Sequence, residues 1–185
     1  MTVLKNLPTE IPIFPLSNFI IFPGMTVPLN IFEPRYIQMV NDSIKTNRTI
    51  GMIQPKKTGE LNKPDLYNIG CAGKITSFNE TEDGRYLIVI NGICRYKIIN
   101  ELTNDKLYRE CKISFDYYAN DLNESNNEEI DLSKIKPIFN ELKILFKKQG
   151  YIINWKDIEK QKIDQTINTL SMASPFTLEE KQILL

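Results

Sequence analysis

The chain reads Ile11-Pro-Ile-Phe-Pro-Leu16, then Phe22-Pro-Gly24, then Pro28-Leu-Asn-Ile-Phe-Glu-Pro-Arg-Tyr36, and the prolines of this stretch limit the secondary structure that it can form. Prolines interrupt every apolar run, so no long helix is expected before Pro34. Because proline cannot donate to a hydrogen-bonded ladder, the runs are expected to form edge or bulged strands joined by tight turns. The interrupting residues are Pro12, Pro15, Pro23, Pro28 and Pro34.

A helix is expected to begin at Pro34, where the missing N–H of proline costs no intrahelical hydrogen bond. Glu33 precedes it, near the positive end of the helix dipole, and an ion pair with Arg35 at this turn is expected to be structural. Apolar residues then recur at helical spacing up to Thr46. The stretch therefore predicts strand, turn, strand and helix in that order.

Composition indicates an ordinary globular protein. The 185 residues include 23 basic and 23 acidic ones, which gives a formal net charge of zero and argues against nucleic-acid binding as the main task. The chain has 3 cysteines in no Cys-x-x-Cys pair and 0 histidines, so neither a disulfide scaffold nor a four-ligand zinc site is expected. With no signal-peptide or membrane-spanning run, we expect a soluble cytoplasmic protein.

Short strands follow the first helix, and they indicate a small barrel or curled sheet. The segment 54–65 has loop composition, while Asp83-Gly84 and Asn91-Gly92 are typical hairpin turns. Continuous apolar residues over 86–90 predict a strand that is buried on both faces or central in a barrel. The expected strands lie at 49–53, 69–78, 86–90, 94–98 and 108–115.

The hydrophobic period changes to that of helices beyond a polar segment at 116–133. A helix is expected from about Ser133 to a stop at Gly150, and further helical segments should follow from Trp155. Thr177 and Glu180 have the spacing of a capping box that opens a last helix. The organisation we expect is a lead-in at 1–9, a β-rich domain at 10–118, a linker at 119–132 and a helical subdomain at 133–185.

The opening stretch resembles that of the Lon protease N-terminal domain, and above all that of small proteins that consist of this domain alone. Three later segments agree in order: 68–75, 86–98 and 175–185. The resemblance implies an α+β fold, in which an N-terminal PUA-like six-stranded pseudo-barrel with one helix is followed by a C-terminal α-helical subdomain. The family pattern usually continues beyond the last helix. Cereblon shares the Lon-like domain, but the cysteines of its drug-binding module are missing here.

No catalytic, cofactor-binding or metal-binding residues are expected. A chain with 0 histidines cannot form a Ser-His or Cys-His pair, and it carries no phosphate-cradling glycine motif. The ATPase and Ser-Lys protease motifs of full-length Lon proteases are absent from the sequence. A family label that contains "peptidase" would therefore describe kinship, and we expect no enzyme and no cofactor.

The resemblance implies a surface that binds unfolded polypeptide or a partner protein. The expected surface is the apolar, proline-bent opening, because proline-interrupted strands leave sheet edges to which an extended peptide could add. Its candidate residues are Phe19, Phe22, Pro23, Met25, Pro28 and Phe32. The competing interpretation is that these side chains fill the barrel core. The sequence leaves the oligomeric state open.

Two other functions stay open from sequence. An RNA-binding module, suggested by PUA-like folds, would need a basic stripe with stacking aromatic residues. The nearby set for it is Arg85, Arg95, Tyr96 and Lys97. An unrecognised hydrolase is the third and least favoured interpretation.

Overall fold

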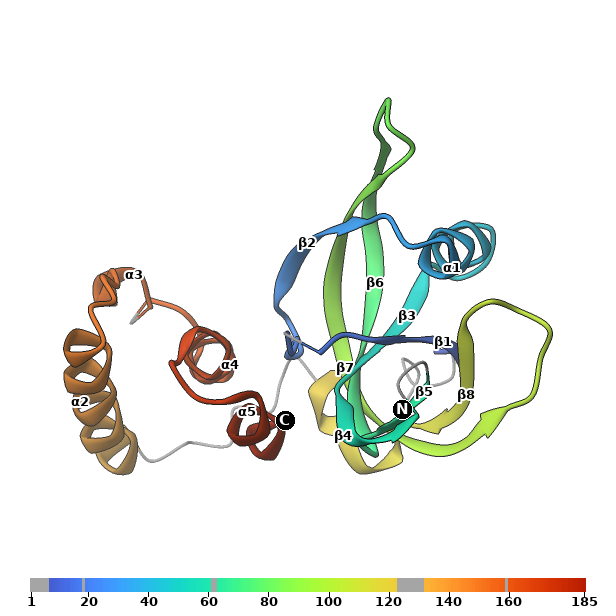
Figure 1. Ribbon diagram of the computed structural model, residues 1–185. Coiled ribbons are helices and arrows are strands. Elements are labelled where there is room, and N and C mark those ends of the chain that lie inside the picture. The colour runs from blue at the N-terminus through green and yellow to red at the C-terminus, as the bar shows by residue number, and fades with distance from the viewer. Residues whose placement is uncertain (1–6, 18, 61–62, 123–131, 159) are drawn as a thin grey trace.

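The structure, a computed structural model, describes residues 7–17, 19–60, 63–122, 132–158 and 160–185. The strands are β1 (Glu10–Pro15), β2 (Thr26–Ile31), β3 (Thr49–Ile53), β4 (Pro55–Glu60), β5 (Lys63–Leu66), β6 (Ile69–Glu80), β7 (Tyr86–Leu102) and β8 (Arg109–Ser114). The helices are α1 (Pro34–Ile44), α2 (Leu132–Lys148), α3 (Trp155–Ile158), α4 (Ile163–Ala173) and α5 (Leu178–Leu184), with a 3₁₀ segment η2 (Asp116–Leu122). A β barrel carries α1 on one side and α2–α5 on the other (Figure 1).

The main sheet confirms the expected barrel. Its six strands follow the order β2-β7-β6-β3-β1-β8, and a further pairing between β7 and β8 closes the sheet on itself. The first half of β7 pairs with β2 and its second half with β8, both antiparallel. The strand β1 runs parallel to β3, and all other pairings in this sheet are antiparallel. The strand β2 therefore lies outside the closed ring, as an appendage of β7.

The prediction of a turn at Asn91-Gly92 is wrong, because β7 runs through both residues as one 17-residue strand. Gly92 instead allows two backbone segments to approach closely. Its N–H donates to the Met25 carbonyl at 2.8 Å, and its carbonyl accepts from Gly24 N–H at 2.9 Å. A side chain at Gly92 would collide with the carbonyl oxygen of Phe22. The glycine is therefore needed to seat the Phe22-Pro23-Gly24 turn on β7.

Two other expectations about the strands also fail. The segment 54–65, expected to be a loop, holds the strands β4 and β5, which form a separate two-stranded sheet. The apolar run 86–90 is central in the barrel, which is one of its two expected placements, but it is not buried on both faces. Its residues alternate between buried and more exposed positions, and Leu87 is 45% exposed. In each case the pairing partner, which composition does not reveal, determines the outcome.

The helix α1 begins at Pro34 as expected and covers the barrel core. Its buried face includes Tyr36 and Met39, and the Tyr36 ring packs on Phe14 with a centroid distance of 4.4 Å. The Tyr86 hydroxyl donates to the Asn41 side chain at 3.2 Å, which fixes the helix against β7. Glu33 and Arg35 form the expected ion pair at 2.7 Å.

The cysteines lie in the interior of the protein. Cys71, Cys94 and Cys111 are all buried and unpaired. Burial raises the pKa of the Cys94 thiol to about 12 and that of the Cys111 thiol to about 11, and it raises the pKa of Cys71 further still. At neutral pH these groups are protonated and behave as small apolar side chains.

The helical part has its own small core, to which Phe146, Ile158 and Leu170 contribute. The Phe146 ring packs edge-on against Trp155 at a centroid distance of 5.7 Å. The last helix opens with the predicted capping box between Thr177 and Glu180. Of the expected linker 119–132, residues 119–122 belong to η2, Leu132 begins α2 and 123–131 lie outside the described residues.

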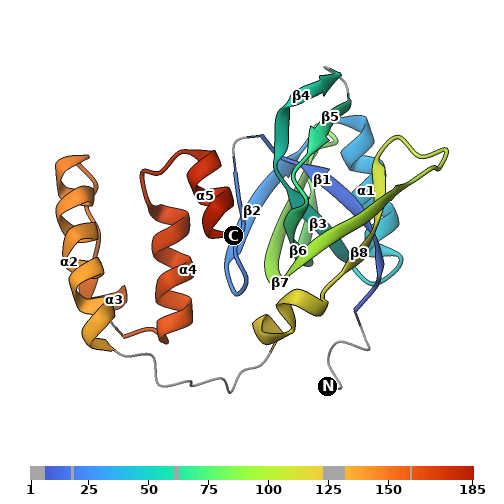
Figure 2. The ribbon, with the colours of Figure 1, turned by 90° about the horizontal axis from the view of Figure 1, so that it is seen from below.

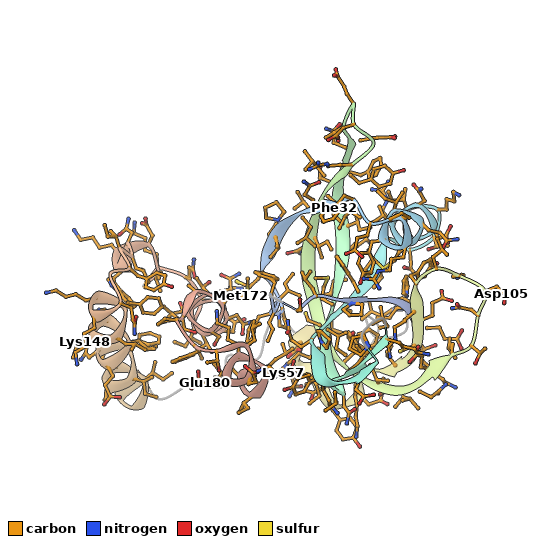
Figure 3. The ribbon with its side chains drawn as sticks, viewed as in Figure 1. Phe32, Lys57, Asp105, Lys148, Met172 and Glu180 are labelled. Carbon is orange, nitrogen blue, oxygen red and sulfur yellow. The ribbon has the colours of Figure 1, made fainter. Side chains whose placement is uncertain are left out.

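The helices dock on the barrel beside β2, as the views in Figures 1 and 2 agree. The Asn168 side chain of α4 donates to the Pro23 carbonyl at 2.9 Å, and that of Gln182 in α5 donates to the Ile69 carbonyl at 3.1 Å. Leu185 is buried in the barrel core. Lys57 of β4 adds an exposed ion pair with Glu179 at 2.7 Å. Figure 3 shows Lys57, Met172 and Glu180 along this junction.

One ion pair joins three parts of the chain. Arg95 on β7 donates to both carboxylate oxygens of Asp121 in η2, at 2.6 and 2.9 Å, and also to the Leu185 carbonyl at 3.1 Å. The Arg95 guanidinium lies over the Tyr118 ring, and the Asp121 side chain is only 8% exposed. Hydrogen bonding to Asp121 raises the pKa of Arg95, against the opposing effect of burial.

We expect Gly92→Ala to destabilise the protein, since the new methyl group must displace the Phe22 carbonyl. Overpacking of this kind costs about 1–3 kcal/mol of unfolding free energy. Urea denaturation followed by circular dichroism measures the change. Ser77→Ala, at an exposed position of the adjacent strand β6, is the control and should leave the midpoint unchanged. Equal midpoints for Gly92→Ala and wild type would contradict the close-approach argument.

We expect Asp121→Asn to destabilise the junction between the β-rich and helical parts. Removing one partner of a buried pair is strongly unfavourable, but the Arg95 side chain is 33% exposed, so we expect a cost of about 2 kcal/mol. Thermal and urea unfolding measure it. The control is Asp83→Asn, which breaks an exposed ion pair with Arg85 and should leave stability unchanged. An effect of Asp121→Asn no larger than that of the control would contradict the structural role of the pair.

Candidate functional site

The strand β2 presents an edge that no other strand covers in the described part of the chain, since its pairing is with β7. The hydrogen bond from Gly92 N–H to the Met25 carbonyl shows which residue pairs of the β2–β7 ladder are hydrogen-bonded. Hydrogen-bonded and non-bonded pairs alternate in an antiparallel ladder. The backbone groups of Val27, Leu29 and Ile31 therefore face β7, while those of Thr26, Pro28 and Asn30 face the open edge.

Apolar side chains lie beside this edge on the outer face of the sheet. In the β2–β7 register Pro28 is opposite Val89, and Asn30 is opposite Leu87. Phe32 follows at the end of β2 and is 64% exposed (Figure 3). Residues directly opposite on paired strands share a face, and diagonal neighbours are within reach of an aromatic ring. We call this set the β2 edge surface: Pro28, Asn30, Phe32, Leu87 and Val89.

The β2 edge surface offers two kinds of contact to an extended peptide. The open backbone groups can pair with a further strand, and the exposed apolar side chains can hold its alternate residues. Pro28 removes one donor from this edge without breaking a bond to β7. Proline on an edge strand also discourages uncontrolled pairing with other chains.

The structure divides the residues proposed from sequence into three groups. Pro28 and Phe32 are exposed and belong to the β2 edge surface, whereas Phe22 is 2% exposed and fills the barrel core. The Phe22 side chain is therefore not available to a partner, because the turn that carries it folds inward over β7. The half-buried residues Phe19, Pro23 and Met25 lie between these extremes, and Phe19 and Met25 pack against the core.

The helical part accounts for the position of Pro23 and Met25. The Pro23 carbonyl accepts from Asn168, and the Thr169 hydroxyl contacts the Met25 sulfur at 3.6 Å. These two residues therefore belong to the junction with α4. A partner at the open part of β2 would meet the barrel beyond this junction.

The sequence analysis missed Leu87 and Val89 as surface residues. The sequence did contain a signal for them, because each lies in a strand-forming run and alternates with buried neighbours. A continuous apolar run does not show which face is outward, however. The assignment requires the register with Pro28 and Asn30, which is a property of the fold.

The residues proposed for RNA binding do not form a basic stripe with stacking rings. Arg95 is engaged by Asp121, and Tyr96 is completely buried with its hydroxyl near the Met52 carbonyl at 3.3 Å. Lys97 lies over the Tyr117 ring, and Arg85 pairs with Asp83 in the hairpin turn. The structure therefore does not bring this set together.

The described residues include neither a candidate metal site nor a reactive thiol. No group of three or more His, Cys, Asp or Glu side chains among them could hold a metal ion. The buried thiols have raised pKa values, which opposes their use as nucleophiles. Separately, none of the helices in the described ranges is long and apolar enough to span a membrane.

Comparisons with known proteins agree with this architecture. A Lon protease from Cytophaga hutchinsonii is 30% identical over 112 residues, which are 60% of this chain and 14% of that protein. A Lon protease from Flavobacterium johnsoniae is 26% identical over 191 aligned residues, which cover 98% of this chain and 22% of that protein. The chain thus spans less than a quarter of the length of these relatives.

A solved structure supports the fold over nearly the whole chain. The N-terminal domain of the Mycobacterium avium complex Lon protease superposes with a TM-score of 0.62 at 16% identity, covering 95% of this chain and 88% of that one. The family model of the ATP-dependent protease La (LON) substrate-binding domain matches residues 10–185. This chain therefore belongs to the Lon substrate-binding domain family.

Proposed function

We propose that this protein is a non-catalytic module that binds extended, unfolded polypeptide segments through the β2 edge surface and passes them, as an adaptor, to proteolysis or quality control. The observation that carries the proposal is the open edge of β2, with exposed Phe32 and Leu87 beside it. Membership of a substrate-binding family supports the same function.

The surface suits unfolded chains for a physical reason. A folded protein pairs its own backbone groups and buries its large apolar side chains, whereas an unfolded segment exposes both. An open strand edge satisfies the backbone groups of such a segment, and the neighbouring apolar residues cover some of its side chains. Backbone pairing is independent of side-chain identity, so this mode accepts many sequences.

The absence of catalysis is part of the proposal. The family match is to a substrate-binding domain, and the relatives named above are several times longer than this chain. The sequence has 0 histidines, and the thiols are buried and protonated at neutral pH. We also propose a reducing, cytoplasmic location, which the unpaired cysteines support.

Replacing Phe32 and Leu87 by serine should weaken binding of an unfolded chain. The probe is fluorescein-labelled, reduced and carboxymethylated α-lactalbumin, and the measurement is fluorescence anisotropy. We expect Phe32→Ser with Leu87→Ser to weaken binding at least about tenfold, equivalent to about 1.4 kcal/mol. The control is Ile152→Ser, which removes a fully exposed apolar residue distant from β2. Undetectable binding by wild type, or equal losses in both variants, would refute the proposal.

Asn30→Pro tests the backbone contribution separately. The Asn30 N–H faces the open edge, so proline removes a donor offered to the partner and leaves the ladder with β7 intact. We expect weaker binding of the same probe with an unchanged melting temperature. Asn30→Ala, which keeps the N–H, is the matched control and should bind like wild type. If the two substitutions act equally, the partner does not pair with this edge.

A further inference from the structure

A cavity of about 670 Å³ lies on the barrel at a place that shares no residue with the β2 edge surface. The cavity walls come from β1, the start of α1, the β4–β5 sheet, the end of β7 and the segment that leads into β8. Asp105, between the lining residues Asn104 and Lys106, projects on the side of the barrel away from the helices α2–α5 (Figure 3). The cavity volume is typical of ligand sites.

Positive charge dominates the lining. Among the described lining residues, Arg35, Lys63, Lys106 and Arg109 are positively charged, each from a different segment, and one residue, Glu101, is negatively charged. The carboxylates that pair with Arg35 and Lys106 belong to Glu33 and Glu110, which are not among the described lining residues. Carboxylates outside the described lining therefore hold Arg35 and Lys106, whereas Glu101 within it holds Lys63 and Arg109.

Glu101 is fully engaged and keeps two cations in place. Arg109 donates to both of its oxygens, at 3.0 and 2.6 Å, and Lys63 approaches within 3.2 Å. Partial burial favours the protonated acid, but the hydrogen bonds from Arg109 and Lys63 prevail and lower the pKa of Glu101. The Arg109 guanidinium also donates to the Pro64 carbonyl at 2.7 Å. Glu101 thus acts as an internal anchor of the basic lining.

The ammonium groups of Lys63 and Lys106 retain donor capacity. Lys106 donates to Glu110 at 2.6 Å and lies 5.2 Å from the centre of the Tyr108 ring. Each ammonium has three donors, and a single carboxylate does not use them all.

The apolar part of the lining suits a peptide better than a nucleic acid. Ile13 lies at a buried position, and Pro15, Pro55 and Pro64 are half-buried proline faces. The aromatic residues of the described lining, Tyr36 and Tyr108, are both buried, and buried rings cannot stack on bases. A carboxylate among the cations, with aliphatic or backbone atoms against the prolines, fits this arrangement.

We propose that this cavity binds a carboxylate of a peptide, either an Asp or Glu side chain or a chain end. The site is independent of the β2 edge surface, so either can fail without the other. An acidic peptide would place its carboxylate near Lys63 and Lys106 and its stem against the prolines. Because the cations are partly solvated, binding should weaken as ionic strength rises.

The test uses three fluorescein-labelled peptides of equal length in anisotropy titrations: a Glu-containing peptide with an amidated end, its Gln analogue with an amidated end, and the Gln analogue with a free carboxylate. We expect the Glu peptide, the free-acid peptide or both to bind in low salt, and the amidated Gln peptide to bind at least about tenfold more weakly. A comparison of the amidated Glu peptide with the free-acid Gln peptide distinguishes a side chain from a chain end as the ligand.

Lys63→Gln combined with Lys106→Gln should weaken this binding about tenfold or more. Both lysines make partly exposed ion pairs, so the fold should be retained, and the melting temperature verifies this. The control is Lys147→Gln with Lys148→Gln on the distant helix α2, which removes the same charge and should have no effect (Figure 3).

Several results would overturn the proposal. They are equal binding of all three peptides, no binding of either carboxylate peptide, and equal losses in the two double variants. Preferential binding of an oligouridylate with the same charge as the Glu peptide would overturn it as well. Binding of reduced carboxymethylated α-lactalbumin by the Lys63→Gln/Lys106→Gln variant shows separately whether the β2 edge surface is intact.

Discussion

The structure depends on the continuous pairing of β7, a strand of 17 residues that serves three neighbours in turn. Its first half holds β2, its second half holds β8, and β6 runs beside most of its length. The same strand supplies Leu87 to the β2 edge surface, Arg95 to the helical junction and Glu101 to the basic cavity. One unbroken backbone thus fixes the relative positions of these three regions.

The attachment of the β2 segment to β7 depends on a small residue at one point. Gly92 lets the Phe22-Pro23-Gly24 turn lie directly on the strand, and the hydrogen bonds on both sides of Gly92 secure β2 there. The prolines of the opening stretch keep that segment from forming a helix, and the glycine gives it a place to bind. These two local constraints, distant in sequence, together produce the open edge.

Local signals were sufficient for the elements whose cause is local. Proline at the first position of α1, the Thr177–Glu180 capping box and the left-handed Gly150 after α2 all act within a few residues. The barrel itself was expected from the resemblance to a known family, and the solved Lon domain supports it. Short-range patterns therefore located most of the helices.

Local sequence patterns gave wrong predictions where tertiary contacts determine the outcome. Asn91-Gly92 looks like a turn because the sequence does not show the Phe22 carbonyl packed against it. Leu87 is outside the core because of its strand register, and Phe22 is inside it because its turn folds inward over β7. The cavity residues come from segments far apart in the chain, so only the folded arrangement reveals their common charge.

The proline in β2 has a consequence for self-association. If two copies paired through their β2 edges about a two-fold axis, Pro28 of each copy would lack the N–H that the ladder needs. The paired ribbon would therefore lack two hydrogen bonds. An unfolded chain that paired with one copy would lack only one hydrogen bond, the one at Pro28. Pro28 thus disfavours the pairing of two copies through this edge more than it disfavours pairing with a single foreign strand.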